Sequence, residues 1–157
     1  MSKVINNRMF AKHEGEFVIF MIGMRINSFF KVNKWFPVSM AMPRMLKELY
    51  ADKESGFLGA GMWFGRTNIM VQYWKSFEHL ENYAKDKNKE HFPAWKSYNQ
   101  KVRKTNAVGV WHETYKVSAG AYENIYVNMP AFGLGKAAKL ILVSEKYEEA
   151  RQRIQKT

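Results

Sequence analysis

Cysteine is missing from this sequence of 157 residues, and its absence excludes several kinds of chemistry. Disulfide bonds, a thiolate nucleophile, and zinc or iron–sulfur sites with cysteine ligands all require it. Long apolar runs are missing too, since the longest, Phe17 to Met24, is too short to span a bilayer. The start of the chain is polar and lacks the apolar core of a secretory signal. We therefore expect a single cytoplasmic domain without disulfides.

Acidic residues are scarce, because 14 Asp and Glu stand against 25 Lys and Arg, a net charge of +11. A basic surface can contact nucleic acid, an anionic membrane or an acidic ligand. The basic residues fall in small groups, at 85–89, 101–104 and 151–156, and each group is typical of a solvated helix face. The predicted strands also lack the RNP pattern of RNA-binding sheets. We predict no nucleic-acid partner and keep contact with a membrane surface as an open alternative.

Aromatic residues make up 15% of the chain and Met is frequent, which predicts a soft, irregular interior. Apolar periodicity and the positions of Gly, Pro and Ser predict the order of elements. This order is a polar arm over 1–15, strands over 16–26, 58–64, 67–74, 107–117 and 122–127, helices over 37–51, 76–85 and 90–102, and a charged amphipathic helix over 136–157. Ser76 is a predicted helix N-cap. Pro43 lies inside the first helical pattern and either kinks that helix or marks its start.

The order of strands and helices in residues 16–135 predicts an α+β domain of the ferredoxin-like βαββαβ type, with an extra C-terminal strand and helix. The strand over 16–26 is apolar on both sides, so both faces of the sheet need cover. Helices cover one face, and a second copy of the chain is the simplest cover for the other. We therefore predict a homodimer whose sheets stack. The predicted units are the arm at 1–15, the domain at 16–135 and the terminal helix at 136–157.

Several segments together resemble one protein family. They are WFGRT at 63–67, VQYWKSFEHLENYAKD at 71–86, HFPAW at 91–95, VGVWHETY at 108–115 and YENIYVNMP at 122–130. The family comprises small, mostly uncharacterised proteins named for a monooxygenase-like protein of the fumagillin pathway. It is similar in fold to the antibiotic-biosynthesis monooxygenases, which are dimeric α/β barrels with a ligand pocket between helices and sheet. The resemblance implies that dimer, that pocket and a small apolar ligand.

The resemblance implies two options for the cofactor. Some members of that superfamily oxidise polyketide quinols without a metal or cofactor, and others bind and degrade haem. Haem degraders carry a Trp on one helix and an axial His on the next. Their pattern, laid on this sequence, places Tyr83 at the Trp position and Trp95 near the His position, with His91 one turn earlier. We therefore expect no cofactor, with haem held by His91 or His112 as the alternative.

His112 and His91 are the candidate catalytic residues, because a histidine that titrates near neutral pH can deprotonate a phenol or enol. The alternatives are a capping or surface position for His91 and a dimer-interface position for His112. Strand alternation sends His112 and Glu113 to opposite faces, so the two cannot form a dyad or a metal site, and we predict no metal. Arg25 is the candidate for holding a substrate anion, with exposure at the strand end as the alternative.

Aromatic side chains are the other candidates for substrate binding, with core packing as the alternative for each of them. They are Trp63, Tyr73, Trp74, Tyr83, Trp95 and Tyr126. The sequence thus leaves three functions open. The first is a monooxygenase-like oxidoreductase that binds and oxidises a small apolar aromatic or polyketide-like metabolite. The second is a haem-binding protein or haem enzyme, and the third is a non-enzymatic binder of a hydrophobic ligand.

Overall fold

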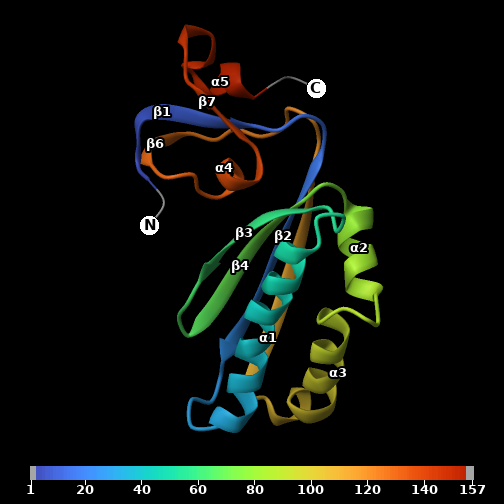
Figure 1. The fold of residues 1–157 in the computed structure, drawn as a ribbon. Helices are drawn as coiled ribbons and strands as arrows, with labels where there is room; N and C mark the ends of the chain where they lie inside the picture. The colour runs from blue at the N-terminus through green and yellow to red at the C-terminus, as the bar shows by residue number, and fades with distance from the viewer. Residues whose placement is uncertain (1–2, 155–157) are drawn as a thin grey trace.

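The computed structural model describes residues 3–154, and Figure 1 shows how their helices and strands are arranged. The strands are β1 (Ile5–Lys12), β2 (Phe17–Ile26), β3 (Phe57–Trp63), β4 (Thr67–Trp74), β5 (Val108–Val117), β6 (Tyr126–Met129) and β7 (Lys139–Leu142). The helices are α1 (Val32–Ala51), α2 (Phe77–Lys85), α3 (His91–Lys101), α4 (Leu134–Ala137) and α5 (Ala150–Arg153), with 3-10 turns η1 (Arg103–Thr105) and η2 (Glu145–Tyr147). The outermost parts of the predicted arm and terminal helix, 1–2 and 155–157, lie outside the described residues.

The main sheet is antiparallel and has the strand order β3-β4-β2-β5. β2 is central, since it pairs with β4 along residues 18–25 and with β5 along residues 17–26. With α1 between β2 and β3, and with α2 and α3 between β4 and β5, the order is βαββαβ. The predicted α+β, ferredoxin-like fold is therefore confirmed. The four described strands form an open sheet with edges at β3 and β5, and they do not close into a barrel.

Helices α1, α2 and α3 all lie on one side of this sheet (Figure 1). Strand side chains alternate between faces, so every second residue of β2 points toward these helices. Met24 of β2 is fully buried there, in one core cluster with Met42 and Met45 of α1. The predicted cap of α2 is confirmed, because Ser76 Oγ accepts a hydrogen bond from the backbone N–H of His79 at 3.4 Å. None of the helices within residues 3–154 is long and apolar enough to cross a membrane.

The first helix is longer than its sequence pattern predicted. α1 begins at Val32, ahead of the expected start at Pro37, and both Pro37 and Pro43 lie inside it. Each proline removes a backbone N–H, which weakens the helix locally. The helix persists because its inner side is buried against the sheet, with Met42 and Leu49 almost fully covered.

A second, smaller sheet has the order β6-β1-β7 and lies beyond one end of the main sheet (Figure 1). The polar arm predicted for the start of the chain is wrong, because β1 pairs through residues 9–12 with all of β7. This pairing buries Phe10 and Ala11. The first residues of β1 are polar, and the strand that pairs with it, β7, comes from the far end of the chain. Local periodicity therefore did not predict β1 as a strand.

The single amphipathic helix predicted over 136–157 is also wrong. α4 ends at Ala137, Ala138 is extended with ψ 176°, and β7 follows directly. Between β7 and residue 154, the charged segment forms η2 and the short α5, which Arg153 anchors through Glu123 at 2.6 Å. The strand predicted over 122–127 starts later than expected. The hydroxyl of Tyr122 instead accepts a hydrogen bond from the backbone N–H of His13 at 2.6 Å.

Candidate functional site

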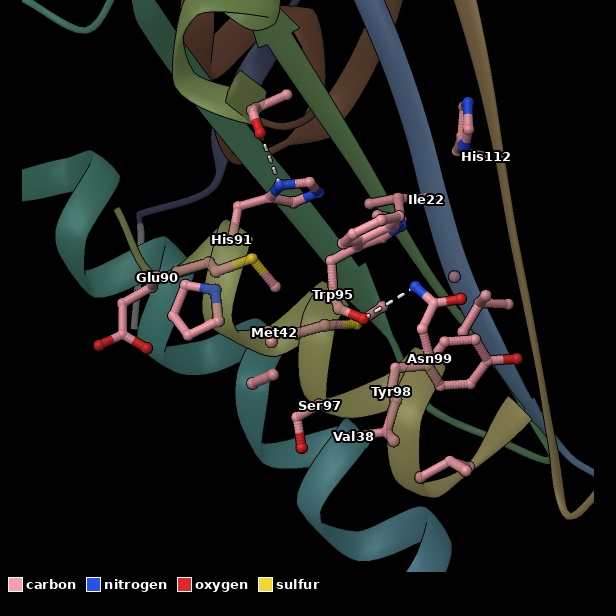
Figure 2. Close-up of a pocket in the computed structure, with 18 of the residues that line it drawn as sticks. Ile22, Val38, Met42, Glu90, His91, Trp95, Ser97, Tyr98, Asn99 and His112 are labelled. Carbon is pink, nitrogen blue, oxygen red and sulfur yellow. Dashed lines mark hydrogen bonds between the residues drawn. The ribbon is translucent and has the colours of Figure 1, made fainter. Parts of the chain in front are cut away.

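A pocket of about 920 Å³ lies between the three large helices and strands β2 and β5 (Figure 2). This volume is within the range of roughly 300–1,000 Å³ that is typical of small-molecule sites. Its walls are mainly apolar, and they include Phe20, Ile22, Val38, Met42, Met45, Leu80, Ala84, Ala94 and Trp95. The pocket therefore lies where the resemblance implied a ligand site, between helices and sheet.

The pocket exists because α3 stands away from the sheet. α3 contains no buried residue, although one side of it is aromatic and apolar. β5 is an edge strand, and its helix-facing residues Val110, His112 and Thr114 line the pocket while remaining exposed. One bond holds the two elements together at the far end of α3, where the hydroxyl of Tyr98 donates to the carbonyl of Val108 at 3.1 Å. Helix and edge strand thus form two walls with unfilled space between them.

His91 stands at the first position of α3 and lines the pocket. Its Nδ1 lies 3.1 Å from the carbonyl oxygen of Ala84, an acceptor, so Nδ1 carries the proton and Nε2 is left with a free lone pair. Figure 2 shows this second nitrogen turned away from that bond and toward the pocket. Burial lowers the pKa of His91, and the nearby charge of His112 lowers it further, while the Ala84 bond opposes both effects. The ring is therefore neutral at neutral pH and can accept a proton.

His112 reaches the same pocket from the opposite wall, on β5. It pairs with Ile22 of β2, which faces the helices, and its ring lies 5.7 Å from the ring of Phe20. Glu113 pairs with Met21 on the other face, where its carboxylate accepts a hydrogen bond from the hydroxyl of Tyr115 at 2.5 Å. His112 and Glu113 are thus separated by the sheet. Within residues 3–154, no three His, Asp or Glu side chains gather in a metal-binding group.

Trp95 is the third predicted site residue in the pocket, one helical turn after His91. Its side chain is 57% exposed and lies open to the cavity, so it is available to stack on a flat apolar ligand. The carbonyl of Trp95 accepts a hydrogen bond from Nδ2 of Asn99 at 3.0 Å, which Figure 2 also shows.

The pocket also contains two residues that we did not predict, Tyr98 and Val102. Together with His91 and Trp95 they recur at helical spacing along α3 and its C-terminal cap, and all four line the pocket. That spacing was the available signal. The pocket also has a cationic end, where Lys34, Lys101 and Arg103 line it.

Two predicted substrate-binding residues are buried in the core instead. Trp74 has no exposed surface, and its Nε1 donates to Oε1 of Gln72 at 2.9 Å. Tyr83 is nearly buried and donates its hydroxyl to Oε2 of Glu48 at 2.9 Å. Burial, together with that carboxylate, raises the pKa of Tyr83 far above its usual range, so the phenol stays protonated. Both side chains join α1 and α2 to the sheet and do not line the pocket.

The remaining predicted residues lie on the side of the sheet away from the pocket. Tyr73 and Tyr126 pack in the cluster around α4, and burial raises the pKa of each phenol. Trp63 packs edge to face on Phe132 at 5.8 Å. Arg25 is exposed at the end of β2, where its Nη1 donates to Oγ1 of Thr67 at 3.1 Å. We therefore assign none of these residues to substrate binding in the pocket.

One protein family matches most of this chain. The family model described as Monooxygenase af470-like matches residues 17–134. The chain is 26% identical over 132 residues to "Monooxygenase af470" of Aspergillus fumigatus, covering 78% of this chain and 46% of that protein. The chain thus spans about half the length of the curated relative that it matches.

Several solved structures resemble this chain in the course of the backbone. A conserved protein from Bacteroides thetaiotaomicron, described as a possible oxidoreductase, is 16% identical with a TM-score of 0.45 and covers 64% of this chain and 97% of that one. A dimeric protein of unknown function and ferredoxin-like fold from Bacteroides fragilis is 12% identical with a TM-score of 0.45. The match covers 65% of this chain and 95% of that one. Likenesses at this level carry no functional argument. The family match spans the whole main sheet and the pocket, and the chain therefore belongs to the monooxygenase af470-like family.

Proposed function

We propose that this protein binds a small apolar aromatic or polyketide-like compound in the pocket and oxidises it with molecular oxygen. One observation carries the proposal: His91 and His112 face a largely apolar pocket of about 920 Å³ from opposite walls. Such a pocket suits a flat hydrophobic molecule, and a neutral histidine suits the removal of a weakly acidic proton. The family name supports the same class of reaction.

The reaction can be written with anthrone as a probe substrate. His91 removes a proton from the carbon opposite the anthrone carbonyl, which leaves an electron-rich enolate held between the helices and the sheet. Oxygen then adds to that carbon. One oxygen atom becomes the second carbonyl oxygen of anthraquinone, and the other leaves as water with the two hydrogens of the reacting carbon. The balance closes without an external reductant, so the proposed reaction uses no resident cofactor.

Residues of the pocket have distinct roles in this proposal. His91 is the base, because the Ala84 bond leaves its Nε2 unprotonated. His112 faces the same space and holds the oxygen-bearing end of the substrate by hydrogen bonding. Trp95 stacks on the aromatic body. The apolar side chains of the walls pack against the body of the substrate.

Filling the pocket tests whether it is the binding site. Ala94 of α3 lines the pocket and packs near the core, whereas Lys96 on the same helix is exposed and does not line it. We expect Ala94→Phe to weaken anthrone binding at least tenfold, because the new ring occupies the ligand's space. Lys96→Phe adds the same side chain to the outer side of α3 and should leave the affinity unchanged. Isothermal titration calorimetry measures both; equal affinity for both variants contradicts the assignment of the site.

We further propose that the chain forms a homodimer through the face of the main sheet that carries no large helix. Met21 and Val71 pair across β2 and β4 on this face and are only half-buried, and Tyr115 of β5 is 49% exposed beside them. α4 covers only the end of the face near Tyr73. A second copy placed by a two-fold axis would cover the exposed apolar residues on the rest of this face.

Charging this face should separate the two copies. We expect Val71→Lys to shift the sedimentation coefficient from that of a dimer to that of a monomer, because a buried unpaired ammonium is costly. Val127→Lys on the second sheet, where the wild-type side chain is 54% exposed, serves as the matched control and should leave the dimer intact. Circular dichroism establishes that each variant is folded. A wild-type protein that sediments as a monomer at all accessible concentrations would refute the proposed dimer.

A further inference from the structure

One end of the molecule combines exposed aromatic side chains with an unbroken excess of positive charge. It is the lower end in Figure 1, where the start of α1, the β3–β4 turn and η1 lie. The backbone N–H of Ile26 donates to the carbonyl of Arg66 at 2.9 Å, and that of Ser28 donates to Ala107 at 3.2 Å. These bonds join the three segments, and we call their combined surface the basic aromatic end.

The apolar part of this end projects into solvent. Phe30 is fully exposed, Phe64 is 73% exposed, and Phe29 is 52% exposed. Val32 and Phe36 continue the surface along α1, one turn apart, and each is about half exposed. Single exposed apolar residues are ordinary, but several of them on segments that backbone hydrogen bonds hold together mark a contact surface.

The charged part of this end has one sign only. Its exposed cations are Arg25, Lys31, Arg66, Lys101, Arg103 and Lys104, and Lys34 is half-buried among them. The guanidinium of Arg66 lies 5.8 Å over the ring of Phe29, so charge and aromatic surface are in direct contact. The sequence has no Asp or Glu between Glu16 and Glu48, between Glu54 and Glu78, or between Glu90 and Glu113, and the segments of this end come from those three stretches. No carboxylate of these segments offsets the positive field.

We infer that the basic aromatic end docks on an anionic lipid bilayer. Exposed Phe side chains can enter the boundary between headgroups and acyl chains, while the surrounding Lys and Arg stay at the level of the anionic headgroups. The apolar stripe of α1 at Val32 and Phe36 is placed to lie along that boundary. This inference does not depend on the proposed oxidation, because it rests on residues of the surface alone.

The charge pattern decides between the bilayer and other occupants. A second copy of the chain would bring the same cations against each other without a carboxylate between them, so this end repels itself. A single-stranded nucleic acid also carries negative charge and can stack on aromatic rings. The aliphatic Val32, exposed beside Phe36, and the fully exposed tip at Phe30 favour insertion into lipid over stacking on bases.

The basic aromatic end adjoins the pocket, so docking on a bilayer would bring the pocket close to the membrane. Lys34, Lys101 and Arg103 belong to the basic aromatic end and also line the pocket. The Nζ of Lys34 donates to the carbonyl of Lys101 at 3.3 Å, which holds α1 and α3 together there. An apolar compound dissolved in the bilayer would therefore meet the pocket at the docked side of the protein.

Vesicle cosedimentation of the whole protein tests this inference. We expect binding to phosphatidylcholine vesicles that contain phosphatidylserine, at least tenfold weaker binding to phosphatidylcholine alone, and a loss of binding as salt is raised. The double variant Phe30→Ser, Phe64→Ser should bind the anionic vesicles at least tenfold more weakly. Lys31→Gln should weaken binding about fivefold, the effect of one basic residue near a charged membrane.

Matched controls stand on β7, at the other end of the molecule. Leu142→Ser removes an apolar side chain that is 56% exposed, and Lys139→Gln removes an exposed cation. Both should bind anionic vesicles like the wild type. The inference is overturned if the wild type does not sediment with anionic vesicles, or if the β7 variants lose as much binding as the others. Tighter binding to single-stranded oligodeoxythymidine than to the vesicles would overturn it in favour of nucleic acid.

Discussion

Replacing His91 with alanine should lower the rate of anthrone oxidation about a hundredfold or more, the contribution of a well-placed general base. The reason lies in three features of one side chain. Its Nδ1 is bonded to the carbonyl of Ala84, its Nε2 is free, and its pKa lies below the usual value because it is buried beside His112. Oxygen uptake in the presence of anthrone measures the rate.

The rate should depend on pH in the way that the protonation of His91 predicts. The base is active when neutral, and its lowered pKa extends the neutral form below the ordinary histidine value of 6.5. The wild-type rate should therefore be flat above about pH 6.5 and should fall only in more acidic solution. Protonation is also disfavoured in the folded state relative to the unfolded state, so His91 contributes stability above pH 6.5 that is lost as the pH falls through its lowered pKa.

His79 provides the matched control for this experiment. It lies on α2 outside the pocket, where its Nδ1 is 2.9 Å from Oγ of Ser76. His79→Gln should leave oxygen uptake unchanged, and His112→Ala should lower it less than His91→Ala, because His112 positions the substrate in this account. Wild-type activity in His91→Ala would remove the base from the mechanism.

Replacing Gly23 with alanine should destabilise the fold by about 3 kcal/mol, the upper range for forcing an extra group into a packed interior. A Cβ at Gly23 would stand 2.2 Å from the backbone oxygen of Asn68 and 2.6 Å from Nε1 of Trp111. The first atom is backbone of the neighbouring strand β4 and cannot turn aside. The central strand therefore requires glycine where the indole of Trp111 lies across it.

Thermal unfolding measures this effect. A loss of about 3 kcal/mol lowers Tm by roughly 6–12 °C in a domain of this size. Gly109 on β5 is the matched control, because a Cβ there would meet Nδ2 of Asn27 at 3.7 Å, an ordinary contact. Gly109→Ala should change Tm by no more than about 2 °C. Equal Tm values for the two variants would contradict the packing of Trp111 over Gly23.

Local pattern was enough to predict the main sheet and its helices. The strand at 17–26 is apolar on both sides because helices cover one face and the other is only partly exposed, and Ser76 marked the start of α2. α1 begins before the predicted start at Pro37, and it continues through Pro43 because burial of Met42 outweighs the hydrogen bond that an interior proline removes. Helix propensity is therefore a weak predictor of where a helix begins when the burial of its side chains determines its extent.

The second sheet was not predictable from local pattern. β1 and β7 pair with each other from opposite ends of the chain; β1 starts with polar residues, and β7, with the sequence KLIL, is apolar but only four residues long. A charged segment after Gly135 therefore resembled a helix. Non-local pairing leaves no trace in the periodicity of either partner, so both termini were assigned wrongly.

The site was predictable by residue type and not by position. His91 and His112 were chosen because histidine suits a base, and the structure brings both to one pocket. Trp74 and Tyr83 were chosen because aromatics line ligand sites, yet they fill the core. An aromatic residue of the core and one of a pocket have the same local pattern. The two kinds of residue differ only in whether they border the gap between α3 and β5. The width of that gap depends on the packing of the whole domain.

The most direct test of the central claim is turnover of anthrone under labelled oxygen-18 gas, with a chelator present and with protein that shows no haem Soret band. We predict protein-dependent anthraquinone with one labelled oxygen atom per molecule. The rate should be strongly reduced in Ala94→Phe and unchanged in Lys96→Phe. Two results would contradict oxidation in this pocket. One is anthraquinone formation that is no faster with the protein than without it, and the other is an equal rate in Ala94→Phe and the wild type.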